Sequence, residues 1–140
     1  MQQICVDTGF LSIYFSKDCS KDVQEVMDKA KEKKIEIHIL NAVLCEVYYQ
    51  ICKIEGKDSA TLIINSFLNK FKPFLIELDE SLIYSTGLLK CQHSTSLSYI
   101  DCMSIAYCQR EKISFHTTEK KIKMIPHNTL QKLKVVKYRF

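Results

Sequence analysis

The fold is decided first by a short segment near the start of the chain, Gln3-Ile4-Cys5-Val6-Asp7-Thr8-Gly9. A short apolar run that is bounded by a polar turn predicts a strand buried on both faces. Asp7 closes this strand, and we expect a short helix over residues 10–15 directly after the turn. The segment therefore predicts a strand, an acid and a helix in direct succession.

The rest of the chain alternates between the same two kinds of element. Ile35, Ile37 and Ile39 alternate with polar residues, which predicts a second strand over residues 35–40. Further strands are expected over residues 74–78, 113–117 and 133–138. Apolar residues at helical spacing predict the intervening helices, over residues 20–31, 41–55, 60–71, 79–89 and 97–110.

Strands that are separated by helices, without two-residue hairpin signals, pair in parallel through crossover connections. The expected architecture is an α/β fold, a three-layer α/β/α sandwich around a parallel sheet of about five strands. Ser20, Asn41 and Asp79 are expected to cap helices. No linker or repeat divides the chain, so we expect a single domain over residues 1–140.

The composition is that of an ordinary globular protein, with 140 residues, 46% hydrophobic residues, 3 Gly and 2 Pro. A chain of this size buries roughly 68–70% of its unfolded surface, and this composition excludes disordered and collagen-like classes. Its apolar runs are far shorter than the roughly 20 residues of a membrane helix. The N-terminal residues do not form a secretory signal. We expect a cytoplasmic protein without a membrane partner.

The seven cysteines and four histidines lack the spacing of a zinc site. No two cysteines form Cys-x-x-Cys, so we expect reduced structural thiols. His38, His93, His116 and His127 are expected at surface or capping positions. With only three glycines, the chain has no phosphate-cradling loop, which argues against binding of nucleoside triphosphates.

The net charge of +4 is unevenly distributed along the sequence. Residues 110–140 carry a charge of +7, and the preceding 109 residues sum to −3. A basic C-terminal section fits a polyanionic partner, because Lys and Arg neutralise phosphates and release counterions. A solvated Lys-rich surface explains the same charges without a partner.

Four acids are predicted at or near the carboxyl edge of the sheet, which is where parallel sheets place their sites. Asp7 closes the first strand, and Glu119 follows the fourth strand by two residues. Glu46 lies on the helix after the second strand, beside its apolar stripe. Asp101 shares a helix face with core residues, where a lone carboxylate is costly.

Four carboxylates at one edge repel one another unless a divalent cation neutralises them. Carboxylate oxygens are hard ligands, which favours Mg²⁺ or Mn²⁺ as the cofactor. Each residue alone also has a structural explanation, with Asp7 and Glu119 as turn or helix-cap residues and Glu46 as a solvated helix acid. The convergence of all four is what favours a metal site.

The order of these motifs resembles that of PIN-domain nucleases. The matching segments are Ile4–Leu11, Leu44–Val47, Leu97–Ala106 and Phe115–Glu119, which span nearly the whole chain. The sequence is most similar to the compact single-domain members, the VapC-like toxins of prokaryotic toxin-antitoxin pairs. This resemblance implies a strand order of 3-2-1-4-5, acids that bind Mg²⁺ or Mn²⁺, and endoribonuclease activity.

The resemblance also implies a role for each motif residue. Asp7, Glu46 and Asp101 match the first three acids of the family. The fourth position usually reads Thr-x-Asp and here reads Thr117-Thr118-Glu119; the longer glutamate favours contact through water over direct ligation. Thr8 matches the hydroxyl residue that orients a carboxylate or a metal-bound water, and Thr117 supports the fourth acid.

The expected activity is metal-dependent hydrolysis of phosphodiester bonds in RNA with exposed single-stranded bases. Asp7 and Asp101 would be the principal ligands, and Glu46 would complete the shell or take a proton from the attacking water. The candidate phosphate contacts are the three lysines that come just after the fourth acid, Lys120, Lys121 and Lys123.

Two alternatives stay open at the level of sequence. One is a housekeeping PIN nuclease that matures or degrades RNA. The other is a non-catalytic PIN-fold module that binds RNA or protein and is indifferent to divalent cations. The toxin interpretation additionally implies a small antitoxin partner, and an exposed apolar helix surface would support a homodimer.

Overall fold

The computed structural model describes residues 1–126 and 133–139, so the predicted role of His127 and the charge of Lys132 lie outside the described residues. One sheet contains the five strands β1 (Gln2–Val6), β2 (Ile35–Leu40), β3 (Phe74–Ile76), β4 (Ser114–Thr117) and β5 (Val135–Lys137). All neighbouring strands are parallel, and their order is β3-β2-β1-β4-β5. The predicted strand order of 3-2-1-4-5 is confirmed.

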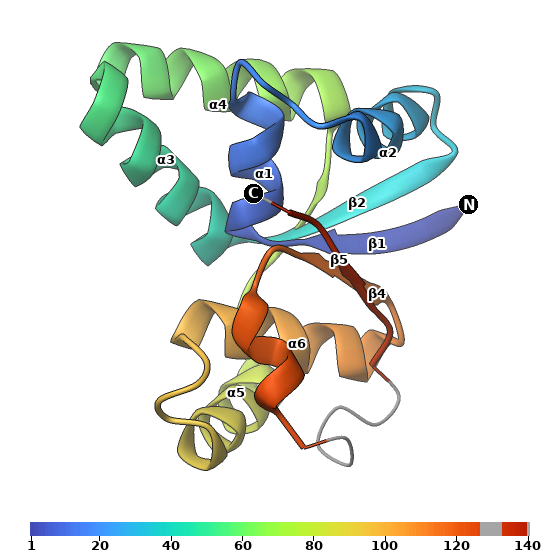
Figure 1. Ribbon diagram of the computed structural model, residues 1–140, viewed down its shortest axis with the longest axis vertical. Coiled ribbons are helices and arrows are strands. Elements are labelled where there is room, and N and C mark those ends of the chain that lie inside the picture. The colour runs from blue at the N-terminus through green and yellow to red at the C-terminus, as the bar shows by residue number, and fades with distance from the viewer. Residues whose placement is uncertain (127–132, 140) are drawn as a thin grey trace.

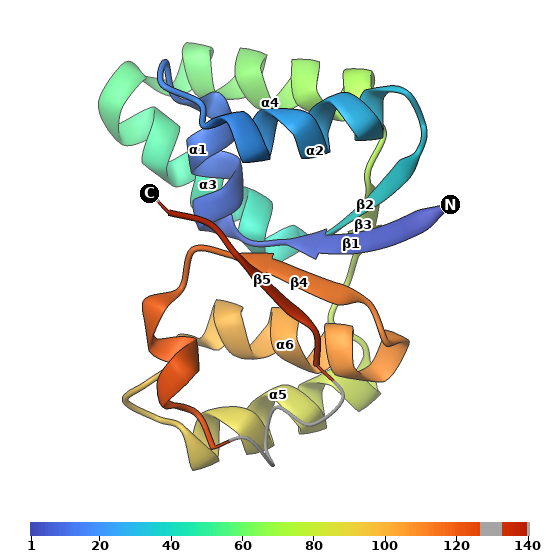
Figure 2. The same cartoon turned by 45° about the vertical axis from the view of Figure 1, so that its right-hand side comes forward.

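Helices cover both faces of this sheet. They are α1 (Thr8–Phe15), α2 (Lys21–Lys31), α3 (Asn41–Glu55), α4 (Lys57–Phe71), α5 (Glu80–Gln92) and α6 (Tyr99–Glu111), followed by a short 3₁₀ helix, η1 (Lys120–Met124). Figures 1 and 2 show α1 to α4 on one side of the sheet and α5 and α6 on the other. The α/β/α sandwich is confirmed. Over the described ranges, no helix has the length and apolar character needed to cross a membrane.

The third strand is shorter than predicted, because it ends at Ile76 and not at residue 78. Ile76 pairs with Leu40, the last residue of β2, so there is no further partner for the ladder. The fifth strand ends at Lys137 for the same reason, since its partner Thr117 is the last residue of β4. Strand length at these two edges is therefore set by the neighbouring strand.

Of the three predicted helix caps, Asp79 is confirmed, Ser20 is confirmed in position only, and Asn41 is wrong. Asp79 caps α5, with its Oδ1 accepting a hydrogen bond from the backbone N–H of Leu82 at 2.9 Å. Ser20 occupies the cap position of α2 but makes no capping bond, because the N–H of Val23 donates to Asp22 instead. Asn41 is already the first residue of α3, since β2 continues into the helix without a turn.

The core is built on the two central strands. Ile4, Cys5 and Val6 of β1 and Phe115 of β4 have no exposed surface, as expected of strands covered on both faces. Cys5 contacts Cys108 of α6, and this contact together with burial raises the pKa of the Cys5 thiol. All seven cysteines are free, and Cys5, Cys102 and Cys108 are buried as expected of structural thiols, whereas Cys45 and Cys91 are exposed.

Two histidines occupy the interior, so their predicted surface or capping role is wrong. His38 is 4% exposed and lies between the hydroxyl of Tyr107 and the carboxylate of Glu36, each at 2.7 Å. His116 is 6% exposed and bonds the hydroxyl of Tyr138 at 2.6 Å, and burial lowers its pKa to about 4. Both tyrosines are distant from their histidines in the sequence, so no local pattern predicts these pairs.

Three lysines have a left-handed backbone just after a helix, where glycine is the usual residue. The φ angles are 62° at Lys33, 47° at Lys72 and 57° at Lys112. Lys72 and Lys112 bond back to the preceding helices, α4 and α6, through their backbone N–H groups. A residue with a Cβ pays about 1 kcal/mol for this conformation.

We expect Lys112→Gly to be more stable than Lys112→Ala by about 1 kcal/mol, because only glycine adopts the left-handed conformation without a steric cost. Urea unfolding measures the free energy of unfolding of both variants. Both have lost the same charge, so charge does not contribute to the difference. A less stable glycine variant would contradict the assigned backbone conformation.

Candidate active site

The carboxylate of Asp7 connects three elements at the carboxyl edge of the sheet. Its Oδ1 accepts a hydrogen bond from the backbone N–H of Phe10 at 2.8 Å and so caps α1. Its Oδ2 accepts from the hydroxyl of Thr117 and from the N–H of Thr118 at 3.3 Å. The side chain is only 5% exposed, so it ties β1, α1 and the end of β4 together from a buried position.

Gly9 makes this arrangement possible, a role that was not predicted from the sequence. A Cβ placed on Gly9 would overlap the side chain of Thr118. The segment after β4 therefore lies against the first turn of α1 only because residue 9 has no side chain. The helix was predicted to start only at residue 10, with Gly9 in the turn before it, whereas α1 begins at Thr8 and so contains Gly9 in its first turn.

Asp101 lies in the first turn of α6, on the face that packs into the core. Its backbone N–H donates to Ser98 Oγ at 3.1 Å, and its carboxylate bonds back to the backbone and side chain of Ser98. This reciprocal pair is a capping box, which was readable in the sequence as Ser-x-x-Asp. Ser104 and Ile105 on the same helix are fully buried, which confirms the predicted core-facing side.

Glu119 is joined to Asp7 through Thr117. The backbone N–H of Glu119 donates to Thr117 Oγ1 at 2.9 Å, and the Thr117 hydroxyl donates to Asp7. The Glu119 carboxylate caps η1 by accepting from the N–H of Lys121 at 2.8 Å. Thr117, which is fully buried, therefore positions the first and the fourth acid of the predicted site together.

The charges of these acids act on one another. Burial raises the pKa of the Asp7 carboxyl, its hydrogen bonds to Thr117 and to backbone N–H groups lower it, and the charge of Glu119 raises it. Burial raises the pKa of Asp101 to about 6, against hydrogen bonds from Ser98, and the charges of Glu119 and Asp7 raise it further. Asp7, Asp101 and Glu119 thus share one electrostatic environment.

Glu46 is the least connected of the four predicted acids. It is half-buried on α3, in the part of the helix that follows the carboxyl end of β2. The charges that raise the pKa values of Asp7 and Asp101 do not include that of Glu46. The structure therefore brings together three of the predicted acids, and Glu46 lies on the same edge of the sheet.

Thr8 is buried, and its hydroxyl has no hydrogen-bond partner among the described residues. It directly follows Asp7, the most buried of the four acids. An unpaired buried hydroxyl is costly, and that of Thr8 is free to bond a water or a ligand. This position agrees with the orienting role that the family resemblance implies for Thr8.

The structural explanation of Asp7 and Glu119 as helix caps is confirmed by their bonds to Phe10 and Lys121. Within residues 1–126 and 133–139, no three His, Cys, Asp or Glu side chains are already arranged to hold a metal ion. The four-acid metal site therefore stays a prediction. The donor set nevertheless fits a hard cation, because Asp7, Asp101 and Glu119 are not ion-paired to any described base.

The three lysines predicted to contact phosphates lie at the rim of this region. Lys120, Lys121 and Lys123 belong to η1, directly after Glu119, and all three are exposed. Arg110, which also belongs to the basic C-terminal section, is instead paired with Asp79 and Glu111. Positive charge is thus available beside the acids on the side of η1.

The sequence matches the family model of the PIN domain over residues 4–128. This match covers most of the chain, and the protein belongs to the PIN domain family. No curated protein matched it.

Several solved structures have the same fold. VapBC2 from Rickettsia felis, bound to a DNA fragment from its promoter, is 17% identical with a TM-score of 0.75, over 98% of this chain and 99% of that one. DNA-bound VapBC from Salmonella typhimurium is 15% identical with a TM-score of 0.71, over 98% of each chain. VapC20 from Mycobacterium tuberculosis, a toxin that cleaves the sarcin-ricin loop, is 17% identical with a TM-score of 0.63, over 80% of this chain and 86% of that one.

We expect Gly9→Ala to destabilise the protein by about 1–3 kcal/mol, because the new methyl group overlaps Thr118 and pushes its N–H away from Asp7. The matched control is Gly87→Ala in α5, where nothing lies within 4 Å of an added Cβ. This control should gain about 0.5–1 kcal/mol from better helix propensity. Urea unfolding of both variants measures the difference, and equal effects would contradict the close approach at Gly9.

The pKa of about 6 for Asp101 gives a testable dependence of stability on pH. Because folding raises this pKa, its contribution to stability is fully present below about pH 4 and is lost as the pH rises through 6. We expect Asp101→Asn, which cannot ionise, to be more stable than the wild type at pH 7 by on the order of 1–3 kcal/mol. This advantage should disappear near pH 4.

The measurement is urea unfolding between pH 4 and pH 8 in a chelating buffer. Asp79→Asn is the control with the opposite sign, because the capping bond from Leu82 and the Arg110 guanidinium lower the pKa of Asp79. It should lose stability at neutral pH. An Asp101→Asn variant that is less stable than the wild type at pH 7 would mean that the charged carboxylate stabilises the fold.

Proposed function

We propose that the protein is a metal-dependent endoribonuclease, a hydrolase of RNA phosphodiester bonds that acts as the toxin of a toxin-antitoxin pair. The observation that carries this proposal is the uncompensated negative charge of Asp7, Asp101 and Glu119 at the carboxyl edge of a PIN-domain sheet. Asp7 and Asp101 both have a raised pKa, and neighbouring carboxylates with raised pKa values are a common property of catalytic sites. The likeness to VapC20, which cleaves an RNA loop, supports the choice of substrate.

The cofactor we propose is Mg²⁺ or Mn²⁺, held principally by Asp7 and Asp101, with Glu119 contacting it through water and Glu46 beside it. All four offer carboxylate oxygens, the donors that these cations prefer. A bound divalent cation polarises the phosphoryl oxygen and makes hydroxide available from water near neutral pH. The unpaired Thr8 hydroxyl is placed to orient a carboxylate or a water at this site.

The other roles in the proposed reaction fall to groups of the protein itself. Thr117 and the N–H of Thr118 hold Asp7 in one orientation, so its carboxylate is positioned before any ligand arrives. Glu46 takes the proton of the attacking water. It is half-buried and, unlike Asp7 and Glu119, does not cap a helix. Lys120, Lys121 and Lys123 contact the phosphates on either side of the scissile bond.

The partners we propose are a small antitoxin protein and a second copy of the chain, in the cytoplasm. The similar VapBC structures are complexes of a toxin with a second protein, which supports an antitoxin. A homodimer is supported by exposed apolar side chains on α5, where Ile83, Tyr84 and Leu88 are 52%, 70% and 59% exposed. Seven free thiols are suited to a reducing compartment.

The competing function is a non-catalytic PIN-fold module. It is favoured by one observation, that Asp7, Asp101 and Glu119 all make helix-capping bonds and so have a structural use. It differs from the nuclease in its indifference to divalent cations. The housekeeping nuclease shares all site chemistry with the toxin and differs only in having no antitoxin.

The test is thermal unfolding with and without Mg²⁺ and Mn²⁺. At ten times its dissociation constant, a bound cation should stabilise the wild type by about 1.4 kcal/mol, or roughly 3–5 °C at this chain length. Asp7→Asn and Asp101→Asn should lose this shift, because each removes a ligand charge. RNA cleavage by the wild type and by both variants is then measured in the same buffers.

The matched control is Asp79→Asn, which also removes a helix-capping aspartate but lies outside the site beside Arg110. It should keep the full cation shift and the cleavage activity. A wild type that ignores both metals, while the two site variants are merely destabilised, would contradict the nuclease and favour the binding module.

A further inference from the structure

A second pocket lies at the amino edge of the sheet, away from the acids. It has a volume of about 370 Å³ and lies between the start of β2 and the C-terminal ends of α2 and α4. Met1 lines it, and Asp7 is six residues further along the extended chain of β1, a distance of roughly 20 Å. The two sites are therefore at opposite edges of the same sheet.

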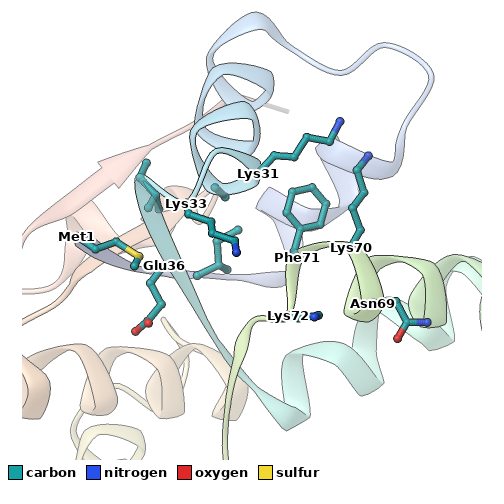
Figure 3. Close-up of a pocket in the computed structure, with 11 residues that line it drawn as sticks. Met1, Lys31, Lys33, Glu36, Asn69, Lys70, Phe71 and Lys72 are labelled. Atoms are coloured by element: carbon teal, nitrogen blue, oxygen red, sulfur yellow. The ribbon is translucent and has the colours of Figure 1, made fainter.

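Four lysines gather at this pocket, which are Lys31, Lys33, Lys70 and Lys72. Figure 3 shows the side chains of Lys31 and Lys70 reaching toward each other from α2 and α4. Their contact lowers the pKa of Lys70, since two ammonium groups repel. Among the described residues, no carboxylate forms an ion pair with any of the four.

The nearby acids leave this charge uncompensated. Asp28 acts on Lys70 only as a weaker, opposing charge. Glu36 lines the pocket, but its carboxylate accepts hydrogen bonds from His38 and Gln3 and points away from the lysines in Figure 3. Four cationic side chains thus line a hollow whose one lining acid, Glu36, bonds Gln3 and His38 and forms no ion pair with them.

Helix dipoles explain only part of this arrangement. Lysines in the last turn of a helix interact favourably with its negative end, which accounts for their presence after α2 and α4. That effect does not require lysines from two helices to face each other. It also does not require lysine in the left-handed conformation at residues 33 and 72, where glycine avoids the strain.

The lining of the pocket also includes apolar side chains. Ala30, Ile35, Ile37 and Phe71 contribute to it, and the Lys70 ammonium lies 5.4 Å from the centre of the Phe71 ring. Asn69 adds a neutral side chain that both donates and accepts hydrogen bonds. A ligand that fits this lining has an anionic end for the lysines and a flat apolar part for the ring.

We propose that this pocket binds a nucleotide, with the phosphate on the lysines and the base against Phe71. Nucleotides combine a phosphate with a ring that stacks on aromatic side chains, and the pocket offers both partners. The bound nucleotide is either a free mononucleotide or one unit of an RNA chain. This site is separate from the acids and does not depend on the proposed nuclease activity.

The experiment measures binding to the full chain by calorimetry in a buffer with a metal chelator, so that no metal-dependent cleavage takes place. The probes are adenosine 5′-monophosphate, adenosine, inorganic phosphate and an adenylate pentanucleotide. We expect saturable binding of the monophosphate or the pentanucleotide, and weaker binding of adenosine and of phosphate alone. Lys33→Gly should weaken this binding by about tenfold, because a charge-assisted hydrogen bond to phosphate is lost.

Lys112→Gly is the matched control, since it removes the same charge from the same backbone conformation at the end of α6. It should bind like the wild type. Both glycine variants suit the left-handed backbone, and an unchanged or higher unfolding midpoint verifies that they are folded. Lys31→Gln adds an independent test from the last residue of α2.

The two sources of the nucleotide give different results. A free nucleotide is supported if the monophosphate binds more tightly than the pentanucleotide and Lys33→Gly weakens this binding. An RNA chain is supported if the pentanucleotide binds more tightly. The proposal is overturned if no probe binds, if Lys33→Gly and Lys31→Gln bind like the wild type, or if phosphate alone binds as tightly as the monophosphate. None of these results depends on whether Mg²⁺ or Mn²⁺ stabilises the protein.

Discussion

The buried carboxylate of Asp7 is the interaction on which the carboxyl edge of the sheet depends. One oxygen begins α1 and the other holds the end of β4 through Thr117 and Thr118. Glu119 is positioned through the same threonine, and Gly9 leaves the space in which these segments meet. Burial raises the pKa of this carboxyl, and its hydrogen bonds to Thr117 and to backbone N–H groups offset part of that shift.

The same edge concentrates negative charge that the protein does not neutralise. Asp101 is stabilised by its capping box with Ser98, yet burial and the neighbouring acids still raise its pKa to about 6. A fold that tolerates this repulsion gives up stability at a site where a cation and a phosphodiester are expected to bind. The structural and catalytic interpretations of the acids are thus compatible, because a carboxylate oxygen that accepts a hydrogen bond still has a second lone pair.

The charge distribution of the whole molecule follows the direction of the sheet. Acids gather where the strands end, and lysines from the ends of α2 and α4 gather where β2 begins. This polarity follows from the parallel topology, since every crossover helix runs back toward the amino edge of the sheet. The parallel topology therefore places these lysines and the acids at opposite edges of the sheet, while Lys120, Lys121 and Lys123 of η1 lie beside the acids.

The sequence by itself determined the strand order expected of the family, the helices, the free thiols and the four candidate acids, because periodicity and motif order are local properties of the chain. Only the tertiary structure decided that Gly9 receives Thr118, that His38 and His116 are buried against tyrosines, and that Lys31 faces Lys70. Each of these contacts joins residues that are far apart in sequence. Their partners are set by how helices and strands pack, and that information is spread over the whole chain.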